Sequence, residues 1–309
     1  MKKLSLLVMA LMASVLLAAC SVKPGFSLEP SFGVNKASTE SESIMIGLSV
    51  STLNNPFFVT LSEGAEAKAN ELGATMTVVD AQDNASKQAS DIEDLIQQQV
   101  DLIVINPVDS SAVAASVQSA NAAGIPVITV DRASEGGEVV SHVASDNKAG
   151  GVLAGEYLTE LIGEGAKVAE LEGVAGSSAA RDRGEGFNTA AEGKLNVVAK
   201  QTANFNRAEG LTVMENILQA NPDIVGVFAH NDEMALGALE AIAASGKDIK
   251  VIGFDATDDA VATVKAGTLA ATVAQKPEEI GIKAIEAAMA YLNGETIAAE
   301  IPVELELIK

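Results

Sequence analysis

Cysteine is almost absent from this chain. Cys20 is the only one in 309 residues, so no disulfide can form within the chain. Aromatic residues are scarce too, with eight Phe, two Tyr and no Trp. Lys and Arg number 20 against 42 Asp and Glu, and the formal charge is −22. Because the sequence has no cluster of Lys and Arg, it lacks the basic patch that nucleic-acid binding usually requires.

Motifs for metals and phosphates are missing as well. His142 and His230 lie at or in apolar runs, without the HExxH or Cys/His spacing of a metal site. The stretch 173–178, Gly-Val-Ala-Gly-Ser-Ser, has no lysine of a phosphate-binding P-loop. We therefore expect neither a metal nor another cofactor.

A long hydrophobic run occurs only at the beginning of the chain. Lys2 and Lys3 precede a run of about fourteen residues, Leu6 to Ala19, which is interrupted only by a serine. A membrane-spanning helix needs about twenty apolar residues, so this run is too short to cross a bilayer comfortably. Its length and its basic start predict a secretory signal peptide over residues 1–19.

The run ends in Leu-Ala-Ala-Cys, residues 17–20, which resembles the lipobox of bacterial lipoproteins. In that family the peptide is cut before the cysteine, whose thiol is acylated. The resemblance implies lipidation at Cys20, and the composition then predicts a flexible tether, so that 20–43 links lipid and globule. We expect an exported protein at the outer face of the cell membrane or in the periplasm, with the lipid as its only membrane contact. An ordinary signal peptide that happens to contain a cysteine is the alternative.

From residue 44 onward, short apolar runs alternate with amphipathic stretches. The runs are Ile44–Val50, Met76–Val79, Leu102–Ile105, Val127–Val130, Lys167–Leu171, Ile224–Ala229, Lys250–Phe254 and Ala271–Ala274. The spacing predicts helices over Pro56–Leu72, Ser86–Gln99 and Ser110–Ala123. Runs this apolar suit strands buried on both faces of a parallel sheet. About ten strand–helix steps are too many for one such sheet, so we expect an α/β protein with two doubly wound lobes.

Polar side chains follow these strands where each one ends. They are Asn54-Asn55, Asp80, Asn106, Asp131-Arg132, His230-Asn231-Asp232, Asp255 and Gln275. Ligands of open α/β sheets bind outside the carboxyl ends of the strands, which predicts a pocket rich in hydrogen-bonding groups. Each Asn or Asp could instead cap a helix, whereas Arg132 and Gln275 are poor caps.

Five stretches of the sequence look familiar. They are SVSTLNNPFF at 49–58, VDR at 130–132, AARDRGEGF at 179–187, NDEMALGA at 231–238 and VIGFD at 251–255. Together they resemble the bacterial ribose-binding proteins of the periplasmic-binding-protein superfamily, from about residue 44 to the C-terminus. The resemblance implies the type I fold: a lobe of 44–145 with 276–304, a lobe of 146–275 with 305–309, and a three-stranded hinge near 145–146, 275–276 and 303–304.

The same resemblance implies a sugar pocket between the lobes. Its hydrogen-bonding residues would be Asn55, Asp131, Arg132, Arg183, Asn231, Asp255 and Gln275, while Phe57, Phe58 and Phe205 would sandwich the sugar ring. Flat aromatic rings suit the apolar faces of a pyranose, and charged groups suit its rim of hydroxyls. Phe57 and Phe58 could also be core residues, Phe58 more readily than Phe57. His230 stands where the family has a familiar Gln.

The implied function is capture of D-ribose by a monomer, with delivery to the membrane subunits of an ABC importer. Whether a chemoreceptor also reads the closed form stays open. Another pentose, allose or a furanose-like signal molecule is the alternative within this class.

Two alternatives come from other classes. A glycosidase could pair Asp131 with Asp255, but cationic and hydrogen-bonding neighbours favour two ionised carboxylates. A sugar-sensing transcription regulator would carry an N-terminal helix-turn-helix, and the expected signal peptide occupies that position.

Overall fold

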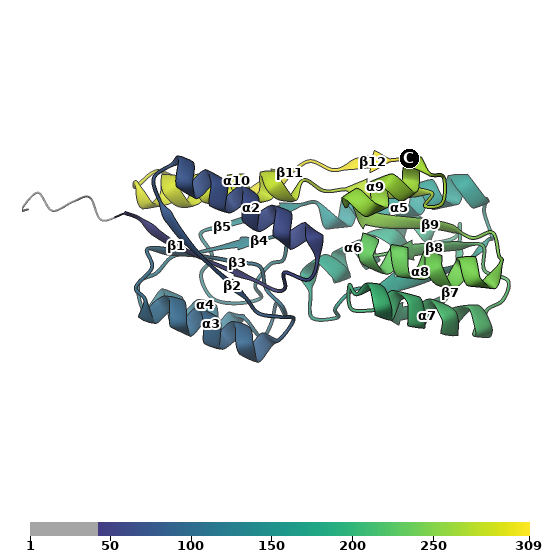
Figure 1. Cartoon of the computed structure of the whole chain (residues 1–309), viewed down its shortest axis with the longest axis horizontal. Helices are drawn as coiled ribbons and strands as arrows, with labels where there is room; N and C mark the ends of the chain where they lie inside the picture. Colours follow the sequence, from purple (N-terminus) through teal and green to yellow (C-terminus); the bar gives the residue numbers. More distant parts are fainter. Residues whose placement is uncertain (1–42) are drawn as a thin grey trace, which may run out of the picture. The chain divides into compact units, whose positions relative to one another are not determined.

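The computed structural model describes residues 43–309, so the predictions for the signal peptide, Cys20 and nearly all of the tether lie outside the described residues. Within 43–309, two six-stranded sheets each carry helices on both faces (Figure 1). No helix in this part of the chain is long and apolar enough to span a membrane.

The first sheet has the strand order β11-β5-β4-β3-β1-β2, and all its strands are parallel. Its strands are β1 (Met45–Val50), β2 (Thr75–Asp80), β3 (Leu102–Ile105), β4 (Val127–Val130), β5 (Ser141–Ser145) and β11 (Glu300–Val303). Its helices are α2 (Pro56–Glu71), α3 (Ala85–Gln97), α4 (Ala114–Ala122) and α10 (Pro277–Leu292). Figure 1 shows α2 and α10 on one face of the sheet and α3 and α4 on the other.

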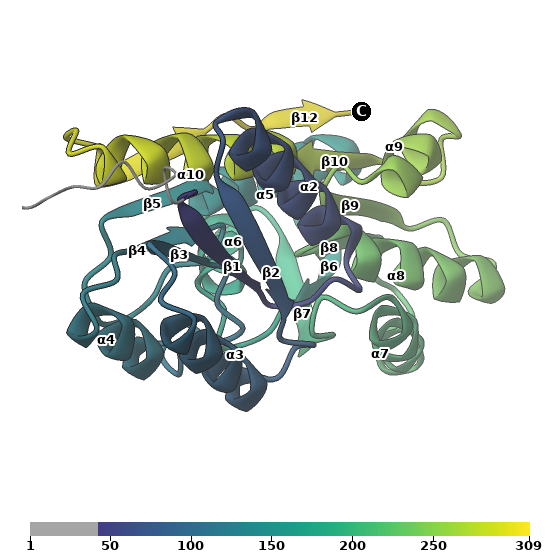
Figure 2. The same ribbon diagram turned by 60° about the vertical axis from the view of Figure 1, so that its left-hand side comes forward.

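The second sheet has the strand order β12-β10-β9-β8-β6-β7. Its strands are β6 (Lys167–Glu172), β7 (Asn196–Thr202), β8 (Gly226–Ala229), β9 (Lys250–Asp255), β10 (Ala271–Ala274) and β12 (Glu306–Ile308). Its helices are α5 (Asn147–Ile162), α6 (Ser178–Ala191), α7 (Arg207–Ala220), α8 (Asp232–Ser245) and α9 (Asp258–Lys265). Helices α7 and α8 lie side by side on this sheet in both views (Figure 1, Figure 2).

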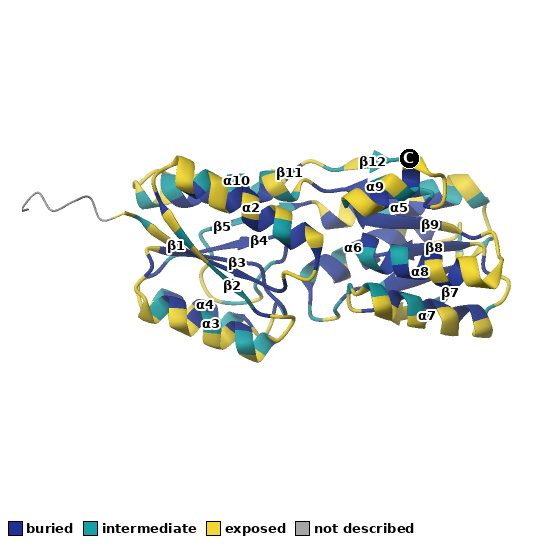
Figure 3. Cartoon of the chain, viewed as in Figure 1, coloured by how far each residue is buried: buried dark blue, intermediate teal, exposed yellow. Residues whose placement is uncertain are grey.

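Each sheet is buried on both faces because successive side chains of a strand point to opposite sides. In β3, Leu102 and Val104 join the core beneath α2 and α10, whereas Ile103 and Ile105 join the core beneath α3 and α4. In β8, Phe228 stacks on Phe187 of α6, with ring centroids 4.8 Å apart. Each such buried side chain contributes about 1.5–3 kcal/mol. Figure 3 shows the buried strands between helices whose outer faces are exposed. The predicted α/β fold with two doubly wound lobes is confirmed.

The chain passes between the sheets at three places. They lie between β5 and α5, between β10 and α10, and between β11 and β12. The predicted lobe boundaries and hinge describe parts that move as units, and they stay a prediction. Below, the "first half" is the part of the chain built on the first sheet, and the "second half" is the part built on the second sheet.

One strand runs against the expected direction. Strand β12 is antiparallel to its neighbour β10, so the second sheet is not wholly parallel. The reason is the chain path. Strand β10 ends where the chain leaves the second sheet, and β12 begins where the chain returns to it, so the two strands must run in opposite directions.

Other differences concern polar strands and one helix start. The apolar pattern did not predict β5 or β7, whose sequences, SHVAS and NVVAKQT, contain several polar residues. Helix α4 begins at Ala114 rather than at Ser110. The Asp109 carboxylate accepts from the N–H groups of Ser111 and Ala112, and the Ser110 N–H donates to the Gly176 carbonyl in the second half. These bonds hold the preceding turn outside the helix.

Candidate ligand-binding site

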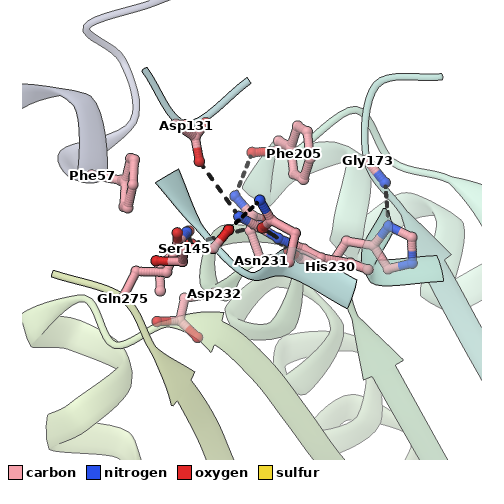
Figure 4. Close-up of polar contacts among 12 residues, drawn as sticks. Phe57, Asp131, Ser145, Gly173, Phe205, His230, Asn231, Asp232 and Gln275 are labelled. Carbon is pink, nitrogen blue, oxygen red and sulfur yellow. Dashed lines mark hydrogen bonds and ion pairs between the residues drawn. The ribbon is translucent and has the colours of Figure 1, made fainter. Parts of the chain in front are cut away.

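One cavity brings all ten predicted site residues together. Its walls are Asn55, Phe57, Phe58, Asp131, Arg132, Arg183, Phe205, Asn231, Asp255 and Gln275, and Ala179 completes the lining. Most of them follow the carboxyl ends of strands in the two sheets, while Arg183 lies on α6 and Phe205 precedes α7. In Figure 4, Asp131, Phe205, Asn231 and Gln275 converge from different elements. That these residues bind a ligand stays a prediction.

Local structure at the start of α2 positions two aromatic rings. The Asn55 side chain accepts from the Phe57 N–H at 3.0 Å, and Pro56 is the first helical residue. Both features favour a helix start. The rings of Phe57 and Phe58 meet edge to face, with centroids 5.1 Å apart. Both rings line the cavity and also belong to the core beneath α2. The two interpretations of Phe57 and Phe58, as core residues and as pocket residues, are therefore compatible.

Arg132 lies between aromatic rings of the two halves. Its guanidinium carbon is 5.2 Å from the ring centroid of Phe58 and 5.1 Å from that of Phe205. Both distances are within the range of cation–π attraction. Its Nη1 donates to the Pro107 carbonyl at 3.1 Å. These contacts hold a buried cation at the junction of the halves.

Arg183 is held from within the second half. Its Nε donates to Oδ1 of Asn147 at 2.8 Å, and its Nη1 donates to the His230 carbonyl at 2.6 Å. The guanidinium carbon also lies 3.9 Å from the ring centroid of Phe254. These contacts orient a planar group with five N–H donors.

Two carboxylates face Arg183 without hydrogen-bonding to it. Nη1 lies 3.6 Å from Oδ1 of Asp255, and Nη2 lies 3.7 Å from Oδ1 of Asp131. Both distances exceed the 2.7–3.2 Å of a normal N–H···O bond. The charges therefore attract one another across the cavity, while their hydrogen-bonding capacity is only partly used.

Buried polar atoms without a partner gather at this cavity. Of the five such side-chain atoms in the described part of the chain, three are site atoms: Asp131 Oδ1, Arg132 Nε and Gln275 Oε1. An unpaired buried polar group costs about 1–3 kcal/mol, so native structures rarely keep one without a reason. The cavity therefore suits a ligand with several hydroxyl groups.

Comparison with known proteins agrees with this geometry. A family model described as "Periplasmic binding protein domain" matches residues 46–296. The chain belongs to the periplasmic binding protein family. The family that the sequence resemblance predicted is thus confirmed.

Relatives and a solved structure cover nearly the same length. The chain is 56% identical to the ribose import binding protein of Bacillus subtilis (strain 168) over 94% of each chain. It is 53% identical to the ribose import binding protein of Escherichia coli (strain K12), over 85% of this chain and 90% of that one. A solute-binding protein from Actinobacillus succinogenes, solved with bound D-allose, matches with a TM-score of 0.80 and 33% identity, over 86% of this chain and 97% of that one.

Membership of this family makes the chain a solute-binding protein and not an enzyme, so the glycosidase alternative is dropped. One argument against a glycosidase was nevertheless wrong. We expected the groups around Asp131 and Asp255 to keep both carboxylates ionised. Instead, burial raises the pKa of Asp255 from 3.8 to about 7, although the Arg183 charge and the Gln275 hydrogen bond act in the opposite direction.

The ten site residues leave very little space between their side chains. The cavity lined by the ten residues has a volume of only about 10 Å³, barely enough for one water molecule. A cavity of about 270 Å³ shares Asn55, Phe58, Arg132 and Phe205 with it, and a cavity of about 610 Å³ shares Phe57 and Asp255. A sugar therefore requires the side chains, or the two halves, to move apart.

Several supporting residues were not among the ten predicted site residues. Asn106 is wholly buried, and its Nδ2 donates to Oδ2 of Asp131 and to the Val130 carbonyl, both at 3.2 Å. Its position at the end of β3 was a usable signal. Asn147, which orients Arg183, lies in the first turn of α5 and carried no such signal.

His230 is another supporting residue. Its Nδ1 accepts from the Gly173 N–H at 3.3 Å (Figure 4), and its Nε2 lies 2.9 Å from Oε1 of Glu170. The imidazole therefore forms its hydrogen bonds behind the cavity wall and is not among the lining groups.

No group of three or more metal-ligating side chains occurs among residues 43–309.

Proposed function

We propose that this chain is the extracytoplasmic solute-binding protein of an ABC sugar importer and that its ligand is D-ribose. One observation carries the proposal: Asp131 Oδ1, Arg132 Nε and Gln275 Oε1 are buried, unpaired and adjacent to three aromatic rings. Two relatives that are more than half identical to this chain over most of its length are named as ribose import binding proteins.

The chemistry of the lining fits a monosaccharide. A pyranose has apolar C–H faces, which suit the rings of Phe57, Phe58 and Phe205, and a rim of hydroxyls that both donate and accept. The carboxylate of Asp131 can only accept, and the guanidinium groups of Arg132 and Arg183 can only donate. Each hydrogen bond to such a charged group contributes about 1.5–3 kcal/mol. A sugar with one hydroxyl misplaced would leave a charge unpaired and would be rejected.

Closure of the two halves provides the binding step. Phe58, Asp131 and Arg132 come from the first half, and Arg183 and Asp255 from the second. A ligand that touches both halves binds the closed form more tightly than the open form, so it shifts the population toward closure. The membrane subunits of the importer would then recognise the closed form, and a monomer suffices for this cycle.

Calorimetric titration of the purified protein with ribose, allose, galactose, glucose, xylose and arabinose tests the proposal. Tight one-to-one binding of ribose, with the other five sugars at least a hundredfold weaker, is the expected result. Absence of binding by all six sugars would overturn the proposed function. Because a solved neighbour holds D-allose, allose is the second candidate ligand. Preference for allose would retain the mechanism and reject the specificity.

We also propose export and lipid anchoring through Cys20, which lies outside the described residues. The support is the apolar run followed by Leu-Ala-Ala-Cys. Metabolic labelling with palmitate in a bacterial host should mark the wild-type protein and leave Cys20→Ala unlabelled. Equal labelling of both proteins, or of neither, would contradict this assignment.

A further inference from the structure

The backbone that presents Asp255 to the cavity is strained. Asp255 has φ +118° and Ala256 has φ +58°, in a region that residues other than glycine rarely adopt. Such residues cost on the order of 1–3 kcal/mol each and persist only where the surrounding structure holds them. Something must therefore stabilise the turn 255–257.

The carboxyl group of Asp232 makes the contacts that hold this turn. Its Oδ2 accepts from the Thr257 N–H at 2.8 Å and from the Thr257 hydroxyl at 3.3 Å. Its Oδ1 accepts from the Thr272 hydroxyl at 2.7 Å, and the same hydroxyl accepts from the Ala256 N–H at 3.2 Å. One side chain thus binds the turn directly and, through Thr272, at a second point.

The surroundings of Asp232 are built for this contact. Asp232 and Thr272 are both fully buried. A Cβ at position 253, the residue two before Asp255, would lie 2.2 Å from Oδ1 of Asp232, so only glycine lets the carboxylate approach strand β9 this closely. Asp232 does not line the cavity. In Figure 4 it lies beyond Asn231 and Gln275, away from Asp131.

We propose that Asp232 is a positioning residue that holds the strained turn 255–257 and so aims the Asp255 carboxylate at the ligand. Asp255 in turn accepts from Nε2 of Gln275 at 2.9 Å, which couples the turn to the unpaired Oε1 of Gln275. The inference rests on the proposed function, because it takes sugar affinity as the property that Asp232 controls.

A double-mutant cycle in the purified protein tests whether Asp232 acts through Asp255. Ribose affinity is measured by calorimetry for wild type, Asp232→Asn, Asp255→Asn and the double variant, with folding checked by circular dichroism. We expect Asp232→Asn to weaken binding at least tenfold in the wild-type background. In the Asp255→Asn background, the same substitution should weaken it less than threefold. A merely structural role would produce the same loss in both backgrounds and would overturn the inference.

Thr272 provides a conservative pair that keeps the test usable if Asp232→Asn fails to fold. Thr272→Ser keeps the bridging hydroxyl and should retain affinity within threefold, whereas Thr272→Val should weaken binding at least fivefold. Ser141→Ala is the matched control, since it removes a buried hydroxyl that donates to the Ala298 carbonyl at 2.9 Å. It should leave affinity unchanged.

The outcomes separate the two proposals. A wild-type protein that binds no sugar overturns the proposed function, and this inference falls with it. Suppose instead that the wild type binds ribose. The role of Asp232 alone is then overturned if Asp232→Asn weakens ribose binding equally in the wild-type and Asp255→Asn backgrounds, or if Thr272→Ser and Thr272→Val weaken it equally.

Discussion

The two halves of the protein hold their site residues differently. In the second half, Arg183 donates to Asn147 and to the His230 carbonyl. Asn231 accepts from the Met234 N–H and donates to the Phe205 carbonyl. In the first half, Asp131 Oδ1 and Arg132 Nε are buried and have no hydrogen-bond partner among the described residues, although Asp131 Oδ2 accepts from Asn106 and Arg132 Nη1 donates to the Pro107 carbonyl.

This difference separates preorganised groups from groups that need a ligand. Side chains already fixed by the protein lose little freedom on binding, which improves affinity. Unpaired buried groups raise the free energy of the ligand-free closed form and are satisfied only when a ligand supplies partners. We therefore expect the second half to supply most of the binding energy and the first half to make closure dependent on the ligand.

The largest effect should come from Arg183 in the preorganised half. Arg183→Ala removes several charged donors at once, so we expect the ribose dissociation constant to rise at least a hundredfold. The protein should remain folded by circular dichroism. Arg181→Ala, two residues earlier on the same helix, is the control, because its side chain is 45% exposed. Retained affinity in Arg183→Ala would disprove the site assignment.

A pair of methionine variants compares the halves directly. Arg132→Met should weaken ribose binding about tenfold to a hundredfold, yet lower the free energy of unfolding of the ligand-free protein less than Arg183→Met does, because Arg132 donates only to the Pro107 carbonyl whereas Arg183 has two acceptors. Arg183→Met should lower that free energy, because Asn147 and the His230 carbonyl lose their donor. Urea unfolding without sugar measures both. Equal losses in the two variants would remove the distinction between the halves.

A smaller effect should follow from the pKa of Asp255. Because folding raises this pKa from 3.8 to about 7, the folded state favours the neutral carboxyl. The resulting stabilisation is complete below about pH 4 and is lost as pH rises through 7, on the order of a few kcal/mol at most. In urea unfolding without sugar, the wild-type free energy should fall between pH 4 and 7 relative to that of Asp255→Asn. A constant difference over this range would show that Asp255 has an ordinary pKa.

The smallest effect should come from an exposed contact between the halves. Arg181 Nη2 pairs with Oε1 of Glu135, and both side chains are nearly half exposed. Exposed ion pairs contribute about 0–1 kcal/mol. Glu135→Gln should therefore change ribose affinity less than about fivefold, with a smaller effect in 1 M salt than at low salt. A tenfold or larger loss would mean that this pair, rather than the cavity, controls closure.

Much of the fold follows from short-range patterns in the sequence. The residues Leu102 to Ile105 are apolar throughout, which is typical of a strand buried on both faces, and Asn55 before Pro56 marks a helix start. The position of polar residues after apolar strands marked six of the ten site residues, and Phe57 and Phe58 closely follow one of them. Arg183 and Phe205 carried no such signal. The resemblance to a family then indicated which of these residues line the pocket. The hydrophobic periodicity of the sequence carries no such information.

Other features depended on the tertiary structure. Strands β5 and β7 contain polar residues, so pairing in the sheets rather than local pattern makes them strands. Asn147 carried no sequence signal, and the strand-end position of Asp232 did not reveal its role, because their partners lie 36 and 25 or more residues away.

The sequence alone thus determined the α/β class, the strand ends and the chemical types of the site residues, because these depend on side-chain character and local spacing. Three other properties depend on how the chain folds: which buried atoms have no hydrogen-bond partner, which charged groups face one another at 3.6–3.7 Å, and why the Asp255 pKa is raised. These properties depend on distance and burial, and both arise only when segments far apart in the chain pack together.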